Sequence, residues 1–271
     1  MDGQSFEDIE AYGRQKWLGE LQVLHLVKQW LGAAVEETDE RGRRQRTTRH
    51  KDERRGTPQG APISPLLANL YMRRFVKGWK TLGHQRALDT HIVNYADDFV
   101  ICCRGTAEEA ARRMRRIMES LKRTVNSDKT RVCRVPEESF DFLGSTIGRC
   151  YRIRTGEPYL GTRPSKKAVR EVCRSISEAT SARWGLKTVE DRVETVNRKL
   201  RGWANYFRQG TVRKAYRAID CHAAKRLRQW LTRKHQQPGH GIRRYPNASL
   251  HGPLGLLELA PLASRRPWAN A

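Results

Sequence analysis

Two adjacent aspartates, Asp97 and Asp98, are the residues with the clearest capacity for chemistry. They interrupt an otherwise apolar stretch, NYADDFVICC, which spans residues 94–103. Carboxylate oxygens are good ligands for hard divalent cations, and two such ions about 4 Å apart stabilise both the attacking and the leaving oxygen in phosphoryl transfer. Ordinary Asx-turn chemistry explains the same pair without any metal. The two residues by themselves leave both interpretations open.

The segments that must position this pair follow from hydrophobic patterning. Residues 91–103 read as a strand, a tight turn at Ala96, Asp97 and Asp98, and a second strand. Further along the chain, the pattern predicts an amphipathic helix with an Arg-rich face over 106–123, a turn leading into a strand over 125–132, and a second hairpin over 139–148.

The segments before the pair include two helices and a highly charged stretch. Residues 5–31 carry helical periodicity, and residues 36–55 are charged and poor in apolar side chains, which fits either a solvated loop or a basic loop in contact with RNA. Gly and Pro mark 56–62 as a loop, after which Ser64 is a candidate N-cap and Pro65 lies in the first helical turn. The predicted apolar face of this helix comprises Leu66, Leu67, Leu70, Tyr71 and Phe75.

The C-terminal half contains the motif RGWANYFR, which begins at Arg201. Trp203, Tyr206 and Phe207 share one helical face and are predicted to pack in the core, and Gly202 would allow a close approach between helices. The cations of this region are expected to face solvent and RNA, since arginine-rich helical surfaces suit structured RNA. They are Arg201, Arg208, Arg213, Lys214 and Arg217.

Composition limits the class of partner. The 271-residue chain has a formal net charge of +24, spread along its length. Such an excess favours nucleic acid as the partner, ahead of an anionic membrane surface or an acidic protein. The longest apolar runs are far shorter than a membrane span, and the start MDGQSFEDIE is acidic and unlike a signal peptide. The six cysteines form no CxxC pair and no zinc-spaced cluster, which predicts reduced thiols in a cytoplasmic protein.

Five motifs occur in an order that identifies a family. RGTPQGAPISPLLANLYM, YADD, VNSDKTRV, FDFLGSTI and RGWANYFRQG resemble, in this order, the motifs of bacterial group II intron reverse transcriptases, also called maturases. The resemblance implies an α+β fold, with a small antiparallel palm sheet followed by a helical thumb and maturase domain. The implied boundaries are an N-terminal remnant over 1–21, a partial palm over 22–150, a thumb-like helical region over 151–186 and a maturase-specific domain over 187–271.

The resemblance also implies roles for individual residues. Asp97 and Asp98 would be catalytic and would bind Mg²⁺. Nucleotide and template would be contacted by Gln59, Gly60 and Lys129, and the primer by Phe142, Leu143 and Gly144. The implied partners are structured intron RNA, a DNA primer or target, dNTPs if the enzyme is active, and a second copy in a dimer. A C-terminal endonuclease domain, which would need a Cys/His cluster, is not expected.

The front of the chain departs from the family pattern. Residues 2–21 resemble the extreme N-terminal segment, and residues 23–37 resemble the helix after the first catalytic motif. The stretch that separates them in the family, with most of the fingers and the palm strand carrying the first catalytic aspartate, is missing between residues 21 and 23. We therefore expect an incomplete polymerase site and an open sheet edge beside the hairpin.

Three functions are compatible with these observations. The first is an RNA-directed DNA polymerase and intron maturase with impaired polymerisation. The second is a non-catalytic RNA-binding splicing cofactor, which a magnesium-dependent primer-extension assay distinguishes from the first. The third is the decayed product of an intron gene, which would lack a cooperative unfolding transition.

Overall fold

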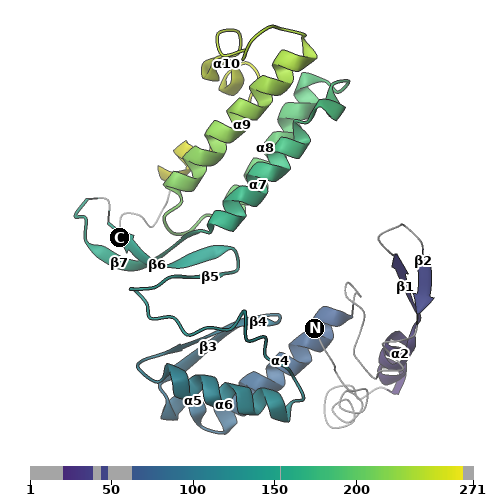
Figure 1. Ribbon diagram of the computed structural model, residues 1–271, viewed down its shortest axis with the longest axis vertical. Coiled ribbons are helices and arrows are strands. Elements are labelled where there is room, and N and C mark those ends of the chain that lie inside the picture. The colour runs from purple at the N-terminus through teal and green to yellow at the C-terminus, as the bar shows by residue number, and fades with distance from the viewer. Residues whose placement is uncertain (1–20, 39–43, 48–62, 153, 265–271) are drawn as a thin grey trace. The chain divides into compact units, whose positions relative to one another are not determined.

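A computed structural model of the chain describes residues 21–38, 44–47, 63–152 and 154–264 (Figure 1). The chain divides into two compact units, Met1–Val132 and Cys133–Ala271. Both units combine helices with small antiparallel sheets, so the expected α+β class is confirmed. The predicted Gln59 and Gly60 lie outside the described residues.

The first unit contains four helices and two hairpins among its described residues. In chain order they are α2 (Leu21–Gly32), β1 (Val35–Thr38), β2 (Arg44–Thr47), α4 (Ser64–Thr81), α5 (His84–Ala87), β3 (Thr90–Tyr95), β4 (Asp98–Cys103) and α6 (Ala107–Ser120). The described parts of 36–55 include the antiparallel strands β1 and β2, so the prediction of a loop there was incomplete. The helix expected over 106–123 is confirmed as α6.

Helix α4 contributes buried side chains to both hydrophobic clusters of this unit. Its N-cap position is occupied by Ile63 without a side-chain cap, so the prediction of Ser64 as N-cap was wrong, whereas the proline in the first turn is confirmed. Tyr71, Phe75 and Trp79 are buried. The predicted face is shifted by part of a turn, because Leu66 is exposed and Trp79 takes part instead. The Trp79 indole donates a hydrogen bond of 3.0 Å to the buried Thr90 hydroxyl at the start of β3.

The β3–β4 hairpin is confirmed. Tyr95 pairs with Asp98, which leaves Ala96 and Asp97 as the turn residues. The side chains of Ile92, Phe99 and Ile101 pack against the cluster formed by α4 and α6. Val93 and Tyr95 point to the other face of the hairpin and are 50% and 66% exposed. In the described part of the chain this sheet has two strands only, as expected for an open edge.

The second unit is a three-stranded sheet followed by a helical bundle. It contains β5 (Phe140–Phe142), β6 (Ser145–Tyr151), β7 (Pro158–Pro164), α7 (Lys166–Ala179), the 3₁₀ helix η1 (Ala182–Trp184), α8 (Val189–Tyr206), α9 (Arg213–Lys234), α10 (Asn247–His251) and the 3₁₀ helix η2 (Ala260–Ser264). The hairpin expected over 139–148 is confirmed as β5–β6, and β7 adds an unpredicted third strand. The turn expected near 125–132 is present, but the strand expected after it is not.

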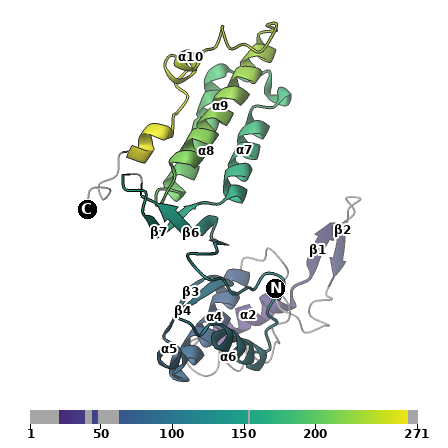
Figure 2. The same ribbon diagram turned by 60° about the vertical axis from the view of Figure 1, so that its left-hand side comes forward.

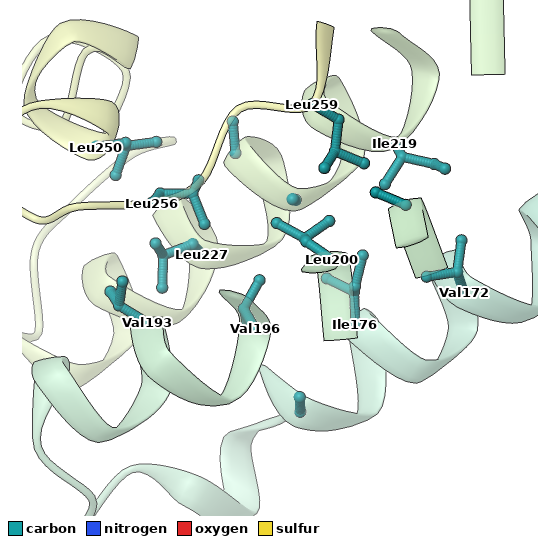
Figure 3. Close-up of a cluster of buried hydrophobic side chains, with 14 of the residues drawn as sticks. Val172, Ile176, Val193, Val196, Leu200, Ile219, Leu227, Leu250, Leu256 and Leu259 are labelled. Atoms are coloured by element: carbon teal, nitrogen blue, oxygen red, sulfur yellow. The ribbon is translucent and has the colours of Figure 1, made fainter. Parts of the chain in front are cut away.

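Helices α7, α8 and α9 lie side by side and enclose one hydrophobic cluster (Figures 1–3). The Ser165 and Thr188 hydroxyls cap α7 and α8 by accepting hydrogen bonds from backbone N–H groups, which satisfies donors that a helix start leaves unpaired. Ile176, Leu200 and Leu227 are fully buried where the three helices meet (Figure 3). The bundle thus has a continuous core of its own.

The segment after α10 is fastened to the bundle by two buried polar side chains. The Asn197 amide on α8 donates to the Gly255 carbonyl at 2.8 Å, and its oxygen accepts from the Leu257 N–H at 2.7 Å. The two carboxylate oxygens of Asp220 on α9 accept from the N–H groups of Leu259 and Ala260 at 2.9 and 2.8 Å. Burial raises the pKa of Asp220, and the two backbone donors oppose this shift.

The aromatic stripe at the end of α8 is divided between core and surface. Phe207 is buried, and Trp203 packs partly buried between Phe207 and Tyr216, with ring centroids 4.5 and 6.0 Å away. Tyr206 is largely exposed, so the prediction that it packs in the core was wrong. A Cβ at Gly202 would meet open space, so the expected close helix approach at this glycine is also wrong.

Candidate metal and nucleic-acid sites

The hairpin turn sends the two aspartates toward different sides. Strand β4 begins at Asp98, and side chains alternate along a strand, so Asp98 shares the outward face with Val100 and Cys102. Asp97 instead lines a cavity of about 30 Å³ on the side of α4 and α6. Both aspartates are exposed. Ala96 in the same turn has a φ of 52°, a left-handed conformation that is uncommon for alanine.

The cavity beside Asp97 is mostly apolar. Its other lining residues are Ala68, Tyr71, Met72, Met118, Leu121 and Arg123. The Arg123 guanidinium lies 5.3 Å from the centroid of the Tyr71 ring. A cavity of this size holds about one water molecule. Asp97 therefore borders a small space that contains a cationic side chain, whereas Asp98 faces outward.

The two aspartates fit part of a magnesium site. Mg²⁺ is commonly held by one or two carboxylates, with substrate phosphates and water completing an octahedron, and two exposed carboxylates on one turn can supply such ligands. Within the described residues there is no group of three or more His, Cys, Asp or Glu side chains that could hold a metal ion. Among the described residues the hairpin therefore offers two carboxylates, and these belong to no larger group of His, Cys, Asp or Glu side chains that could hold a metal ion.

Lys129 lies in an Asx turn. The Asn126 side-chain oxygen accepts hydrogen bonds from the N–H groups of Asp128 and Lys129 at 3.0 and 3.1 Å. The turn leaves the Lys129 side chain exposed. The Lys129 ammonium group is therefore accessible to a phosphate. The assignment of Lys129 to nucleotide binding stays a prediction.

The turn at Leu143 and Gly144 contacts the C-terminal end of helix α8. Both residues have positive φ values, 49° and 74°, as a type I′ hairpin turn requires. The Tyr206 hydroxyl donates a hydrogen bond of 3.1 Å to the Leu143 carbonyl. A Cβ at Gly144 would lie 3.2 Å from the ring of Phe207. The predicted primer-binding segment, which begins at Phe142, is therefore anchored to α8, although sequence reasoning did not connect the two motifs.

The predicted RNA-binding cations of the bundle are all exposed: Arg201, Arg208, Arg213, Lys214 and Arg217. Arg201 forms an ion pair with Glu194 at 3.2 Å. The same two helices carry further exposed cations that were not predicted, among them Arg198 on α8 and Lys225 on α9. Helical spacing signals both, because Arg198 lies three residues before Arg201 and Lys225 lies eight after Arg217.

The exposed surface of α9 carries cations without carboxylates. Its one acidic residue in 213–234 is Asp220, which is buried and occupied by the two backbone donors. The basic charge at this surface is therefore not balanced within the helix, and it suits a polyanion.

His222 on α9 contacts two residues of the neighbouring helix α7. His222 Nε2 lies 2.9 Å from the Ser177 hydroxyl oxygen and 3.0 Å from the Cys173 carbonyl oxygen. Burial is the main cause of the lowered pKa of His222; the hydrogen bond with the Cys173 carbonyl opposes this shift, and the nearby Arg226 and Lys225 add to it. The neutral form is thereby favoured, which is consistent with a role in joining α7 to α9. Burial also raises the pKa of the Cys173 thiol, so this thiol is poorly suited to act as a nucleophile.

Among the described helices, none has the length and apolar character that a membrane crossing requires.

The chain matches two family models. One is described as reverse transcriptase (RNA-dependent DNA polymerase) and covers residues 4–147, and the other is described as group II intron, maturase-specific domain and covers residues 169–246. Protein YkfC from Escherichia coli (strain K12) is 33% identical over 146 residues, a match that spans 42% of this chain and 38% of YkfC. The similarity thus covers well under half of that relative.

Proposed function

Because the chain belongs to the reverse transcriptase family and matches the group II intron maturase-specific domain, we propose that it is an intron maturase that binds structured intron RNA. The observation that carries this proposal is the exposed face of α9, where cations stand without a surface carboxylate. RNA phosphates supply the missing negative charge, and arginine side chains match phosphate oxygens in bidentate geometry. The exposed Arg208, after α8, extends the proposed contact.

The proposal includes an impaired polymerase site. Asp97 and Asp98 would bind Mg²⁺, which neutralises charge on the reacting phosphate when bound. Their side chains lie toward different sides of the hairpin, so this turn alone does not clamp two ions at the spacing that phosphoryl transfer needs. We attribute the missing ligand to a fingers and first palm segment absent between residues 21 and 23. The acidic residues at 2, 7, 8 and 10 lie outside the described residues.

The remaining partners follow from the same proposal. A DNA primer or target and dNTPs would bind only where the polymerase site is completed, with Gln59, Gly60 and Lys129 at the nucleotide and the turn 142–144 at the primer. A second reverse transcriptase chain could provide the missing strand in a dimer. All six cysteines are free thiols, which supports the cytoplasmic location expected from the sequence.

RNA binding is tested by removing two charges from α9. Lys214→Gln/Arg217→Gln should weaken binding of the structured intron RNA and make the dependence of log affinity on log salt shallower by about 1.4–1.8, the value for two lost phosphate contacts. The control is Arg149→Gln/Arg152→Gln in the same unit, which removes two exposed cations that are ion-paired with Glu137 and Glu157. Equal losses in both variants, or salt-insensitive binding by the wild-type protein, would contradict the proposal.

Polymerisation is tested by primer extension on an RNA template. The chain by itself should give no magnesium-dependent extension, because positioning of the nucleotide and charge stabilisation are both incomplete. A variant with a family fingers and palm segment inserted between residues 21 and 23 should gain activity that Asp97→Ala abolishes. Extension by the unmodified chain that Asp97→Ala removes would show that another carboxylate already completes the site. It would favour the active polymerase over the non-catalytic splicing cofactor.

A further inference from the structure

We propose that Tyr206 is a positioning residue, through which RNA bound between helices α8 and α9 stabilises the turn at residues 142–144. This turn, here called the primer turn, joins β5 to β6. The segment between the two helices, here called the α8–α9 connection, runs from Tyr206, the last residue of α8, to Val212. The inference rests on the proposed function, which assigns the primer to the primer turn and RNA to Arg208.

The primer turn has a backbone conformation that needs support. Leu143 has a φ of 49°, in the left-handed region that leucine rarely adopts. Such a conformation persists where the surrounding structure holds it, and it is concentrated at functional sites. The Leu143 carbonyl accepts a hydrogen bond of 3.1 Å from the Tyr206 hydroxyl. The ring of Phe207 packs beside Gly144, so two consecutive residues of the α8–α9 connection hold the turn.

The other end of the α8–α9 connection is fastened to strand β7 of the same sheet. The Thr211 N–H donates a hydrogen bond of 2.7 Å to the Thr162 carbonyl, and the Tyr159 hydroxyl lies 3.1 Å from the Thr211 hydroxyl oxygen. Gly210 has a φ of 78°, and a Cβ there would collide with the Thr162 carbonyl oxygen. Because β7 pairs with β6, both ends of the connection are attached to one sheet.

The residues between these two attachments are available to a ligand. Arg208 and Gln209 are exposed. Arg208 lies two residues after Tyr206 and two before Gly210, and the exposed Arg213 opens α9 directly after the connection. A ligand stabilises the conformation to which it binds. RNA phosphates held by these arginines would therefore restrain the connection, and with it the turn that the connection holds.

The hydroxyl is the part of Tyr206 that carries this role. The Tyr206 side chain is 65% exposed, and its ring meets that of Phe207 edge-on, with centroids 4.8 Å apart. Tyr206→Phe keeps the ring and this contact and removes the hydrogen bond to Leu143. The substitution therefore separates positioning of the primer turn from packing of the core.

The Ser165 amide reports on the primer turn. Its N–H donates a hydrogen bond of 2.8 Å to the Gly144 carbonyl, so its hydrogen exchanges with solvent when this contact opens. Amide hydrogen exchange measures such local opening. Ser165 is 2% exposed, and RNA therefore has no direct access to it. Slower exchange at Ser165 in the RNA complex would have to pass through the structure around the turn.

Hydrogen exchange resolved to single amides, with and without a folded group II intron transcript, tests the proposal. In the wild-type protein the transcript should slow exchange at Thr211 and at Ser165 by about fivefold or more, the lower end of typical coupling between sites. Tyr206→Phe should bind the transcript with wild-type affinity and keep the effect at Thr211, but it should lose most of the effect at Ser165.

Tyr151→Phe is the matched control. Tyr151 lies on β6 and is 60% exposed, and its hydroxyl makes no hydrogen bond within the described residues. This variant should behave like the wild type at both amides. Thermal melting of both variants establishes that they remain folded.

A merely structural hydroxyl gives a different result. Its removal would speed exchange at Ser165 equally with and without the transcript, so that the ratio of the two rates would stay unchanged. That outcome would overturn the proposal, as would slowing at Thr211 without slowing at Ser165 in the wild type. In both cases the transcript still binds, and the proposed function survives. If the wild-type chain binds no transcript, the proposed function fails and this inference fails with it.

Discussion

In the unit Cys133–Ala271, three long helices and the C-terminal segment share a single hydrophobic cluster, whereas the described residues of Met1–Val132 divide their buried side chains between two smaller clusters. The bundle closes its core with its own residues. The hairpin that carries the two aspartates is packed on one face and exposes Val93 and Tyr95 on the other. The comparison teaches that a closed helical bundle and a hairpin with one exposed face can occur in one chain, because each depends on its own local packing.

The largest loss of stability is expected from a substitution that creates a cavity in the core of the bundle. Leu227 is 0% exposed, so Leu227→Ala should lower the free energy of unfolding by about 3–5 kcal/mol. Denaturant unfolding measures this loss. Leu186→Ala is the matched control, because Leu186 is 101% exposed and should change stability by less than about 0.5 kcal/mol. Similar losses in both variants would refute a closed core in this unit.

A slightly smaller loss is expected at the end of α8, where the core meets the surface proposed to bind RNA. Trp203→Ala removes a ring packed on Phe207 and Tyr216 and should cost about 3 kcal/mol of unfolding free energy. Arg208→Ala, a few residues away, should weaken RNA binding and leave the melting temperature almost unchanged. An unchanged melting temperature for Trp203→Ala, or unfolding caused by Arg208→Ala, would reverse these two roles.

A pH dependence is expected inside the bundle. The pKa of His222 is lowered in the folded state by burial, so below about pH 6.5, the ordinary pKa of histidine, the unfolded chain binds a proton more readily. The stability that the neutral imidazole provides is complete above this pH and is lost as the pH falls through the lowered pKa. Unfolding at pH 7.5 and 5.5 should show this decrease in the wild type and a smaller one in His222→Gln. The same pH dependence in both proteins would assign the effect to other groups.

The smallest change in stability is expected on the open face of the hairpin. Val93→Thr keeps a β-branched side chain on a half-exposed position and should alter the free energy of unfolding by less than about 0.5 kcal/mol. It should nevertheless slow self-association, because exposed apolar sheet surface promotes pairing with other chains. Light scattering over time measures this effect. A large loss of stability would mean that Val93 is packed after all, and the contrast between the two units would weaken.

Local patterns in the sequence predicted much of this fold. Alternation around Asp97 and Asp98 predicted β3–β4, and the pattern over residues 139–148 predicted β5–β6. Strand β7 was missed because Pro158, Gly161 and Pro164 are typical of loops. Its position is fixed instead by contacts with distant residues, such as the hydrogen bond of 2.7 Å from the Thr211 N–H to the Thr162 carbonyl.

The candidate sites show the same limit. The carboxylates were found because they are adjacent in one hairpin, and the cations because they lie within a short stretch of sequence that covers the end of α8 and the start of α9. The exposure of Tyr206 was not predicted, since its position on α8 repeats the spacing of buried neighbours. Its hydroxyl reaches the Leu143 carbonyl 63 residues away, a contact that no local pattern encodes.

The two polar side chains that hold the C-terminal segment set a practical limit on dissecting this protein. The maturase-specific match ends at residue 246, yet Leu250, Leu256 and Leu259 are buried in the bundle core. A fragment that ended at the edge of the match would lose these leucines and would leave Asn197 and Asp220 without their backbone partners. Such a fragment should misfold or aggregate. A fragment that keeps the bundle folded must therefore extend beyond the end of the family match, through η2.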